Sequence, residues 1–247
     1  MTFCLGILSK EGIVGLADTR ITSGNDTTTA KKIFSVQRDK HSFFIMTSGL
    51  RSVRDKAITY FGEVIEAQDE KFTKLYKAVN QFGEQVKRVA LEDKRSLYEA
   101  GLSFNLFSIV GGQLEEDKEP KLYLLYPQGN WIEIGKGTPY VIIGNTGFGN
   151  PILKRSLTYE SRLEFGLKSG FLSFDATRIS ANDVDYPIDT VVLKNNEYKL
   201  YEQRFDEKEL GHISEFWNAR LKDGIDKLPA VALSRALTAD EQMPLLQ

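Results

Sequence analysis

The residues of this chain that are best suited to chemistry stand at its start. Thr2 directly follows Met1, and threonine is small enough at the second position for removal of the methionine to be expected. The hydroxyl of Thr2 would then lie beside its own free amine. Because the pKa of an α-amine is about 8, an appreciable fraction is unprotonated near neutral pH and can accept the hydroxyl proton. Thr2 is therefore a candidate nucleophile that carries its own base.

The elements around Thr2 predict that an acidic side chain lies beside it. Residues 3–9 have the pattern of a strand, a tight turn follows, and residues 13–18 have the pattern of the returning strand. The register of such a hairpin brings Asp18 and Arg20, at the end of the second strand, back alongside the start of the first. A carboxylate is thus expected next to the candidate nucleophile.

A third strand, residues 32–37, is expected to add a cation at the same end of the sheet. Lys31 and Lys32 stand at its start, and adjacent strand residues face opposite ways. Only one of the two lysines can therefore point at Thr2. Lys32, directly before Ile33, is the preferred candidate.

These residues resemble the N-terminal region of proteasome β subunits, which are N-terminal nucleophile hydrolases. The shared positions are Thr2, the Ala-Asp-Thr-Arg of residues 17–20 and the Lys-Ile of residues 32–33. Two later segments are similar to a bacterial proteasome-like branch called Anbu, the ancestral β subunit. They are the Ile-Ile-Gly-Asn-Thr-Gly-Phe-Gly-Asn-Pro-Ile-Leu of residues 142–153 and the Phe-Asp-Ala-Thr-Arg-Ile-Ser of residues 174–180, the latter followed by Pro-Ile-Asp at residues 187–189.

The resemblance implies an α+β fold, the four-layer αββα sandwich of the N-terminal nucleophile hydrolases. It also implies how the site residues act. Thr2 attacks, Asp18 bridges to Lys32, and the positive charge of the lysine lowers the proton affinity of its neighbours. Asp175 and Ser180 would orient the amine of Thr2 through hydrogen bonds. The alternative for each of the two acids is a turn cap or a surface carboxylate.

Further polar positions are expected along a substrate groove. In the resembled family the glycine that corresponds to Gly49 lies where a peptide pairs with strand edges, and backbone amides near Ser48 and Gly49 would stabilise an oxyanion. The alternative for Gly49 is an ordinary turn from a strand to a helix. Thr146 stands where the family tends to carry serine, and the amides of its loop would support the oxyanion or the amine. Arg20 is expected at the groove too, with a structural ion pair as the alternative.

Periodic patterns predict the layers that must position these residues. Apolar residues three and four apart indicate two helices, residues 52–67 and 71–99, that cover one face of a sheet. Further strands are expected at 41–48, 103–110, 121–126, 131–134, 190–194 and 197–205, and further helices at 151–167 and 207–226. This order fits two sheets that pack on each other with helices outside.

The chain is long enough for one large domain. It has 247 residues, of which 41% are hydrophobic, and we expect a single domain over residues 1–228. Residues 229–247 are too few to form a core of their own. We expect them to be a C-terminal arm that contacts a neighbouring subunit of a homo-oligomer, with a loosely docked terminus as the alternative.

Composition argues against several other classes of protein. The formal charge of −2 gives no electrostatic reason to expect nucleic acid, and no apolar run approaches the roughly 20 residues of a membrane span. His41 and His212 lie too far apart in sequence to indicate a metal site, and residues 144–150 lack the Gly-Lys-Ser/Thr ending of a phosphate loop, so no cofactor is expected. The one cysteine, Cys4, fits a reducing compartment, so we expect the cytoplasm and assign Cys4 no chemical role.

The residues and the resemblance together predict a proteasome-like threonine hydrolase that cleaves peptide or amide bonds within a homo-oligomeric, ring-like assembly. The nearest alternative is an amidohydrolase with a narrow range of substrates or an amide transferase, because the sequence does not show whether water or another amine accepts the acyl group. A subunit that only builds the ring, with a silent site, is the alternative of another class. Any ATP-dependent partner would be a separate chain, since nothing here resembles an unfoldase.

Overall fold

The predicted first hairpin lies in the middle of a five-stranded antiparallel sheet. The structure, a computed structural model, describes residues 2–23, 26–67 and 72–229. Strand β1 (Phe3–Ser9) pairs with β2 (Gly12–Asp18), and every residue of both strands is buried because both faces of the sheet are covered. The sheet is completed by β10 (Tyr140–Gly144) beside β1 and by β11 (Ile188–Lys194) and β12 (Leu200–Phe205) beyond β2.

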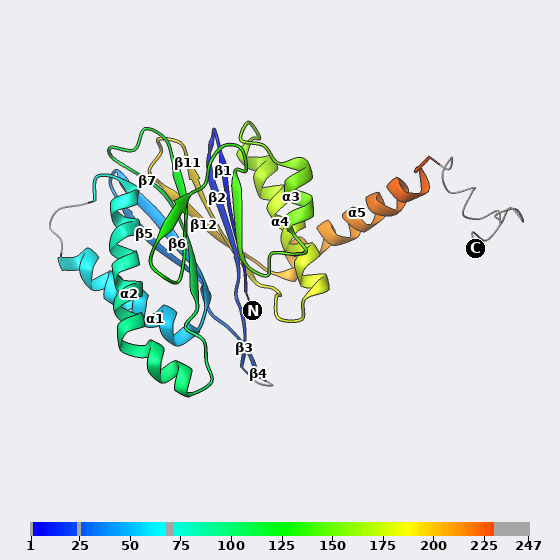
Figure 1. Ribbon diagram of the computed structural model, residues 1–247. Coiled ribbons are helices and arrows are strands. Elements are labelled where there is room, and N and C mark those ends of the chain that lie inside the picture. Colours follow the sequence, from blue (N-terminus) through cyan, green and yellow to red (C-terminus); the bar gives the residue numbers. More distant parts are fainter. Residues whose placement is uncertain (1, 24–25, 68–71, 230–247) are drawn as a thin grey trace, which may run out of the picture.

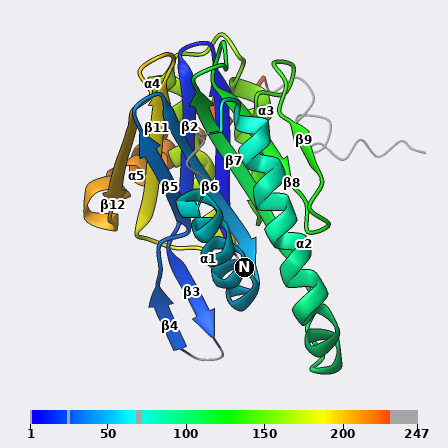
Figure 2. The same cartoon turned by 90° about the vertical axis from the view of Figure 1, so that its left-hand side faces the viewer.

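A second five-stranded antiparallel sheet packs against the first. Its strands follow chain order and are β5 (Ile33–Arg38), β6 (His41–Gly49), β7 (Leu106–Leu114), β8 (Lys121–Leu125) and β9 (Trp131–Glu133). A two-stranded ribbon of β3 (Arg20–Ser23) and β4 (Asp26–Thr29), which the sequence pattern did not predict, connects β2 to this sheet. Figure 2 shows the ribbon projecting from the end of the sandwich at which β1 begins.

Two pairs of helices cover the outer faces of the sheets, as Figure 1 shows. On the second sheet lie α1 (Arg51–Ala67) and α2 (Leu75–Glu99), close to the two helices predicted for this face. On the first sheet lie α3 (Asn150–Ser156) and α4 (Leu163–Ser180). The predicted four-layer αββα sandwich is confirmed.

Three apolar clusters hold the four layers together. Phe61 of α1 packs between the second sheet and α2, with its ring centroid 5.3 Å from that of Phe82. Phe174 of α4 packs on Phe3 of the first sheet, with 6.0 Å between ring centroids. The third cluster fills the space between the sheets and includes Phe44. Burial of such large aromatic side chains fixes the spacing of the layers, and thus the place where the strand ends meet.

The predicted single helix at residues 151–167 is wrong. The segment forms two helices, because α3 ends before Leu157, which is extended, and α4 begins only at Leu163. Between them the backbone N–H of Thr158 donates to the hydroxyl of Ser161 at 3.1 Å, a local bond that competes with helix formation. The second helix then continues to Ser180, so the predicted orienting residues Asp175 and Ser180 are helical.

The last described helix, α5 (Glu207–Asp226), matches its predicted range and extends away from the sandwich (Figure 1). Asp206 and Glu209 form a capping box at its start, with backbone-to-side-chain bonds of 2.9 and 3.0 Å. The predicted C-terminal arm lies, apart from Pro229, outside the described residues, and the domain division stays a prediction. Among the described helices, none is both long and apolar enough to cross a membrane.

Candidate functional site

A buried ion pair joins the ends of three segments at one end of the sandwich. Asp18, the last residue of β2, is fully buried, and its Oδ1 accepts a hydrogen bond from Lys32 Nζ at 2.8 Å. The same oxygen accepts a bond from the backbone N–H of Phe3 at 2.8 Å. Lys32 Nζ also donates to the backbone carbonyl of Arg20 at 2.7 Å. The predicted convergence of an acid and a lysine on the start of β1 is therefore present in the structure.

Burial dominates the electrostatics of this pair. Loss of solvent raises the pKa of Asp18 above its usual range, while the charge and hydrogen bond of Lys32 and the N–H of Phe3 oppose that rise. A carboxylate in this position depends on its cation, because an uncompensated charge in a medium of low dielectric is costly. Asp18 and Lys32 therefore form one functional unit.

Thr2 is held from both sides by its backbone. Its neighbour Phe3 donates to Asp18, and its own carbonyl accepts a bond from the N–H of Asn145 at 2.7 Å. Gly144, with φ of 87°, sits so close that a Cβ there would lie 1.9 Å from the Thr2 carbonyl oxygen. Only glycine fits that conformation and that approach. Thr2 itself is 8% exposed, so its position is fixed by β10 and β2 together.

A cavity of about 590 Å³ opens at Thr2. Lys32 lines it, as do Ser48 and Gly49 at the end of β6, where a substrate groove was predicted. Gly49 has φ of 143°, and a Cβ on it would lie 1.9 Å from the carbonyl oxygen of Asn105, so this turn also requires glycine. Of the predicted site residues, the structure thus brings Thr2, Lys32, Arg20, Ser48 and Gly49 to one cavity, with Asp18 bonded behind it.

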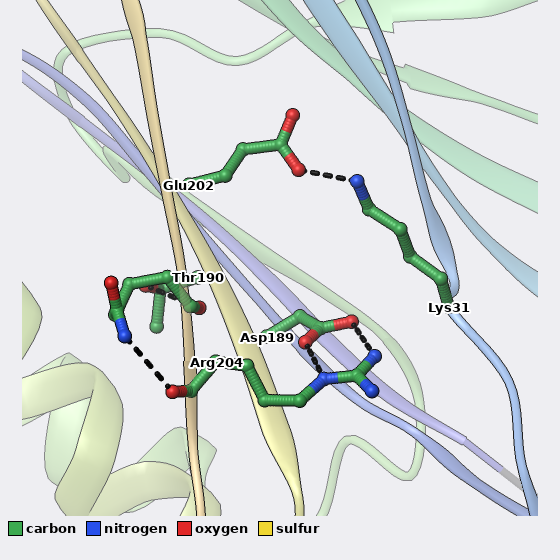
Figure 3. Close-up of a pocket in the computed structure, with 6 residues that line it drawn as sticks. Lys31, Asp189, Thr190, Glu202 and Arg204 are labelled. Carbon is green, nitrogen blue, oxygen red and sulfur yellow. Dashed lines mark hydrogen bonds and ion pairs between the residues drawn. The ribbon is translucent and has the colours of Figure 1, made fainter.

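Lys31 and Lys32 directly precede β5, and Lys32 bonds Asp18 while Lys31 has a different partner. Lys31 forms an ion pair with Glu202 on β12 and is half exposed. Together with Asp189 and Arg204, which form an ion pair of their own, it lines a separate cavity of about 240 Å³ (Figure 3). The choice between the two lysines therefore favours Lys32, the one that contacts Asp18.

Comparison with known proteins places this arrangement in a family. The family model for proteasome subunits matches residues 2–167, which include the cavity at Thr2 and the pair behind it. The chain belongs to the proteasome subunit family. No curated protein matches this proteasome-family chain by sequence.

Solved structures of Anbu proteins share the whole sandwich of this proteasome-family chain. An Anbu mutant from Hyphomicrobium sp. strain MC1 is 26% identical with a TM-score of 0.84, over 93% of this chain and 98% of that one. The Anbu complex from Pseudomonas aeruginosa, solved as a helical assembly, is 27% identical with a TM-score of 0.84, over 92% and 97%. Anbu from Yersinia bercovieri, at 23% identity, shares the fold with a TM-score of 0.85 over 92% and 97%. The predicted resemblance to the Anbu branch is confirmed.

Asp175 and Ser180 are not among the described residues that line the cavity at Thr2, and the orienting role expected for them stays a prediction. Asp175 is buried in α4 and accepts a bond from Arg178 Nε at 3.1 Å, one helical turn along. Ser180 is exposed and donates to the carbonyl of Ala176 at 2.9 Å. Neither side chain lines the cavity at Thr2 among the described residues. Each of the two side chains bonds another residue of α4, so the proposed site does not include Asp175 or Ser180.

The side chain of Thr146 is not part of the cavity wall formed by the described residues, although its loop contacts Thr2. It is exposed in the loop after β10 and does not line the cavity among the described residues. Its neighbour Asn145 makes the backbone bond to Thr2. The loop therefore reaches Thr2 through its backbone rather than through the predicted hydroxyl.

Three residues of the site were not predicted. Asp185, in the loop before β11, forms an ion pair with Arg20 Nη1 at 2.9 Å, so the structural alternative for Arg20 is present together with its place at the cavity. Arg51 and Arg54, in the first turn of α1, line the cavity as well. A sequence signal for them existed. That turn carries two cations and no acid, against the preference of a helix N-terminus for negative charge.

Cys4 fits the expectation of a structural role. It is fully buried in β1, and its thiol faces the carbonyl of Thr47 at 3.7 Å. Burial raises the pKa of the Cys4 thiol far above its usual range, which the charge of Lys32 only partly opposes. A thiol that stays protonated is a poor nucleophile.

Proposed function

We propose that this chain is a threonine hydrolase that attacks peptide or amide bonds through Thr2. The observation that supports this proposal best is the bond network from Lys32 through Asp18 to the N–H of Phe3, the residue after Thr2. It holds the backbone next to a hydroxyl-bearing residue in a cavity that a buried cation, Lys32, also lines. Membership of the proteasome subunit family adds support.

The proposed reaction uses the α-amine of Thr2 as general base. The amine takes the proton of the Thr2 hydroxyl as Oγ forms a bond to the substrate carbonyl carbon. Backbone N–H groups at Ser48 and Gly49 are our candidates for holding the negative charge on the carbonyl oxygen. The C–N bond then breaks, and the departing amine takes the proton from the ammonium group. Water, activated by the same amine, releases the acyl group and restores Thr2.

Lys32 acts on this reaction through its charge. A cation near the amine and the hydroxyl lowers their proton affinity, which favours the free amine and stabilises negative charge on Oγ. Asp18 holds the ammonium group of Lys32 in place and keeps the N–H of Phe3 oriented. Both residues are therefore positioned to tune the nucleophile rather than to replace it.

The test is cleavage of a mixed peptide library by three proteins: wild type, Thr2→Ala and Thr2→Ser. We expect the wild type to release new amines, the Ser variant to retain part of that rate because it keeps a hydroxyl beside the amine, and the Ala variant to release none. Cleavage by Thr2→Ala at the wild-type rate would contradict the proposal. A wild type that cleaves nothing while assembling normally would favour a ring subunit with a silent site.

We also propose that the chain works as a homo-oligomer. Anbu from Pseudomonas aeruginosa forms a helical assembly, and α5 offers apolar side chains for a contact between subunits. Phe216, Leu221 and Ile225 on α5 are 59%, 45% and 64% exposed. A ring-like assembly would confine the cavities at Thr2. The cytoplasm and a separate ATP-dependent partner stay predictions, and the first of these is consistent with the free, buried Cys4.

A further inference from the structure

The cavity at Thr2 has walls of one charge. Four basic side chains line it, and no acidic side chain does so among the described residues. The basic residues are Arg20, Lys32, Arg51 and Arg54. Field lines from like charges add inside a concave site with walls of low dielectric, so the cavity favours an anionic guest.

The basic side chains that line the cavity outnumber the carboxylates paired with them by one. Lys32 and Arg20 each have a carboxylate of their own, namely Asp18 and Asp185. The two arginines of α1 share one carboxylate, since Arg51 Nε lies 3.3 Å and Arg54 Nη2 lies 2.5 Å from Asp55. Four cations therefore face three carboxylates. Asp55 is half exposed and stands outside the main cavity.

Arg54 is the cation best placed to bind a ligand. Its side chain is only 16% exposed, whereas that of Arg51 is 58% exposed. It uses Nε and Nη2 for Asp55, which leaves Nη1 outside that pair. The partial burial of Arg54 strengthens its field, and a guanidinium group matches the geometry of a carboxylate.

A smaller cavity, lined in part by Thr47, indicates which kind of ligand side chain would fit beside the main cavity. It measures about 160 Å³ and shares Lys32, Thr47 and Arg54 with the main cavity. Much of its remaining wall is apolar, formed by Ile33, Phe34, Ile45 and Ile58. Lys31 lines it too, but its ammonium group already has Glu202 as a partner. The one carboxylate on its wall is Asp55, which the two arginines already share. An apolar wall with a cation accommodates a short methylene stem that ends in a carboxylate.

We infer that the acyl group attacked by Thr2 carries a carboxylate side chain, as in a glutamyl residue, and that Arg54 binds this carboxylate. The inference rests on the proposed function, because it names the class of substrate for the same site. Arg54 is thus a specificity-determining residue. Its charge selects the acyl side of the bond, while Thr2 performs the chemistry.

The test is equilibrium binding to Thr2→Ala, which needs no catalysis. Two N-acetylated tetrapeptide amides that differ only in a C-terminal Glu or Gln are titrated by calorimetry at low salt. We expect the Glu peptide to bind about tenfold more tightly, because a charge-assisted hydrogen bond replaces a neutral one. Adding Arg54→Gln should bring the ratio near one, and Arg54→Lys should restore part of it.

A matched control has the same change of charge far from the cavity. Arg162 stands before α4, is 74% exposed and lies 3.7 Å from Glu164. Arg162→Gln should leave the Glu-to-Gln ratio unchanged. Thermal denaturation confirms that each variant is folded, and Arg51 remains beside Asp55 when Arg54 is replaced.

Two results would overturn the inference: equal affinities for the Glu and Gln peptides, or a ratio that survives Arg54→Gln in a folded protein. The outcome is separable from that of the proposed function. If the wild type cleaves peptides but the binding ratio is one, only the inference fails. If the ratio is tenfold but the wild type cleaves neither peptide nor any member of the library, the proposed hydrolysis fails and the charge preference of the cavity stands.

Discussion

Lys32 Nζ lies 2.8 Å from Asp18 Oδ1, and both side chains are almost completely withdrawn from solvent. The lysine directly precedes β5 of one sheet, and the aspartate is the last residue of β2 in the other. The ion pair therefore ties the two sheets together at the end where Thr2 lies. Stability and the candidate chemistry depend on the same contact.

Lys32→Met should destabilise the protein strongly, because it leaves Asp18 buried without its cation. Breaking a buried pair by removing one partner costs about 3–5 kcal/mol. Lys31→Met is the matched control, since Lys31 is half exposed in its pair with Glu202 and such pairs contribute about 1 kcal/mol or less. Urea denaturation measures both. Equal losses for the two variants would contradict the assigned roles of the neighbouring lysines.

The pH dependence of activity should report Asp18. Because burial raises the pKa of Asp18, the residue binds its proton at a higher pH than a solvated carboxyl does as the solution is acidified. Protonation of the Thr2 amine lowers kcat/KM as the pH falls below about 8, and protonation of Asp18 removes the partner of Lys32, so a second acid limb should appear above the ordinary carboxyl value near 3.9. In Asp18→Asn the second limb should disappear, the limb of the amine should remain, and the activity should be low throughout. A second limb that survives in Asp18→Asn would contradict its assignment to Asp18.

Gly144→Ala should displace Thr2. The new Cβ would meet the Thr2 carbonyl oxygen at 1.9 Å, and φ of 87° is unfavourable for alanine. Backbone strain of this kind costs about 1–3 kcal/mol before the clash is counted. Gly147→Ala, in the same loop but with open space around it, should change the free energy of unfolding by less than about 1 kcal/mol. Labelling of Thr2 by a covalent probe should slow at least tenfold in Gly144→Ala alone.

Asp175→Asn tests whether Asp175 stabilises α4 through Arg178 or orients the amine of Thr2. Asp175 bonds Arg178, which also lies over the ring of Tyr186 at 5.0 Å. We expect a loss of about 1–3 kcal/mol in unfolding free energy, because a charged, buried hydrogen bond is weakened. The kcat of the folded variant should stay within about twofold of wild type. A large fall in kcat without loss of stability would restore Asp175 to the site.

The proposed assembly predicts the effect of removing the tail. Sedimentation velocity of the chain truncated after Lys227 should show smaller particles than the full chain. Phe216→Ser combined with Ile225→Ser, on the exposed face of α5, should act in the same direction. Particles of unchanged size in both variants would rule out a contact through α5 and the tail.

The sequence pattern could predict contacts between residues that lie close together in the chain. The hairpin of β1 and β2 has a tight turn and a fixed register, so the approach of Asp18 to the start of the chain followed from pattern alone. Alternation in the expected third strand allowed only one of Lys31 and Lys32 to face Thr2, and Lys32 was the preferred candidate; in the structure Lys32 is the one that bonds Asp18. The pairing of Arg20 with Asp185 joins positions 165 residues apart, and only the folded chain brings them together. The bond between Asp175 and Arg178, one helical turn apart, was not predicted either, because a short motif does not reveal which residues face each other on a helix. The orienting role of Asp175 stays a prediction.

Catalysis by an N-terminal Thr2 is tested by the intact mass of untagged protein, before and after incubation with a peptide epoxyketone, a probe that reacts with an N-terminal threonine. We expect a mass without Met1, a gain of one probe per chain, and no gain in Thr2→Ala. A chain that keeps Met1 and gains no probe would contradict catalysis by Thr2, because an acylated nitrogen is no base for the Thr2 hydroxyl.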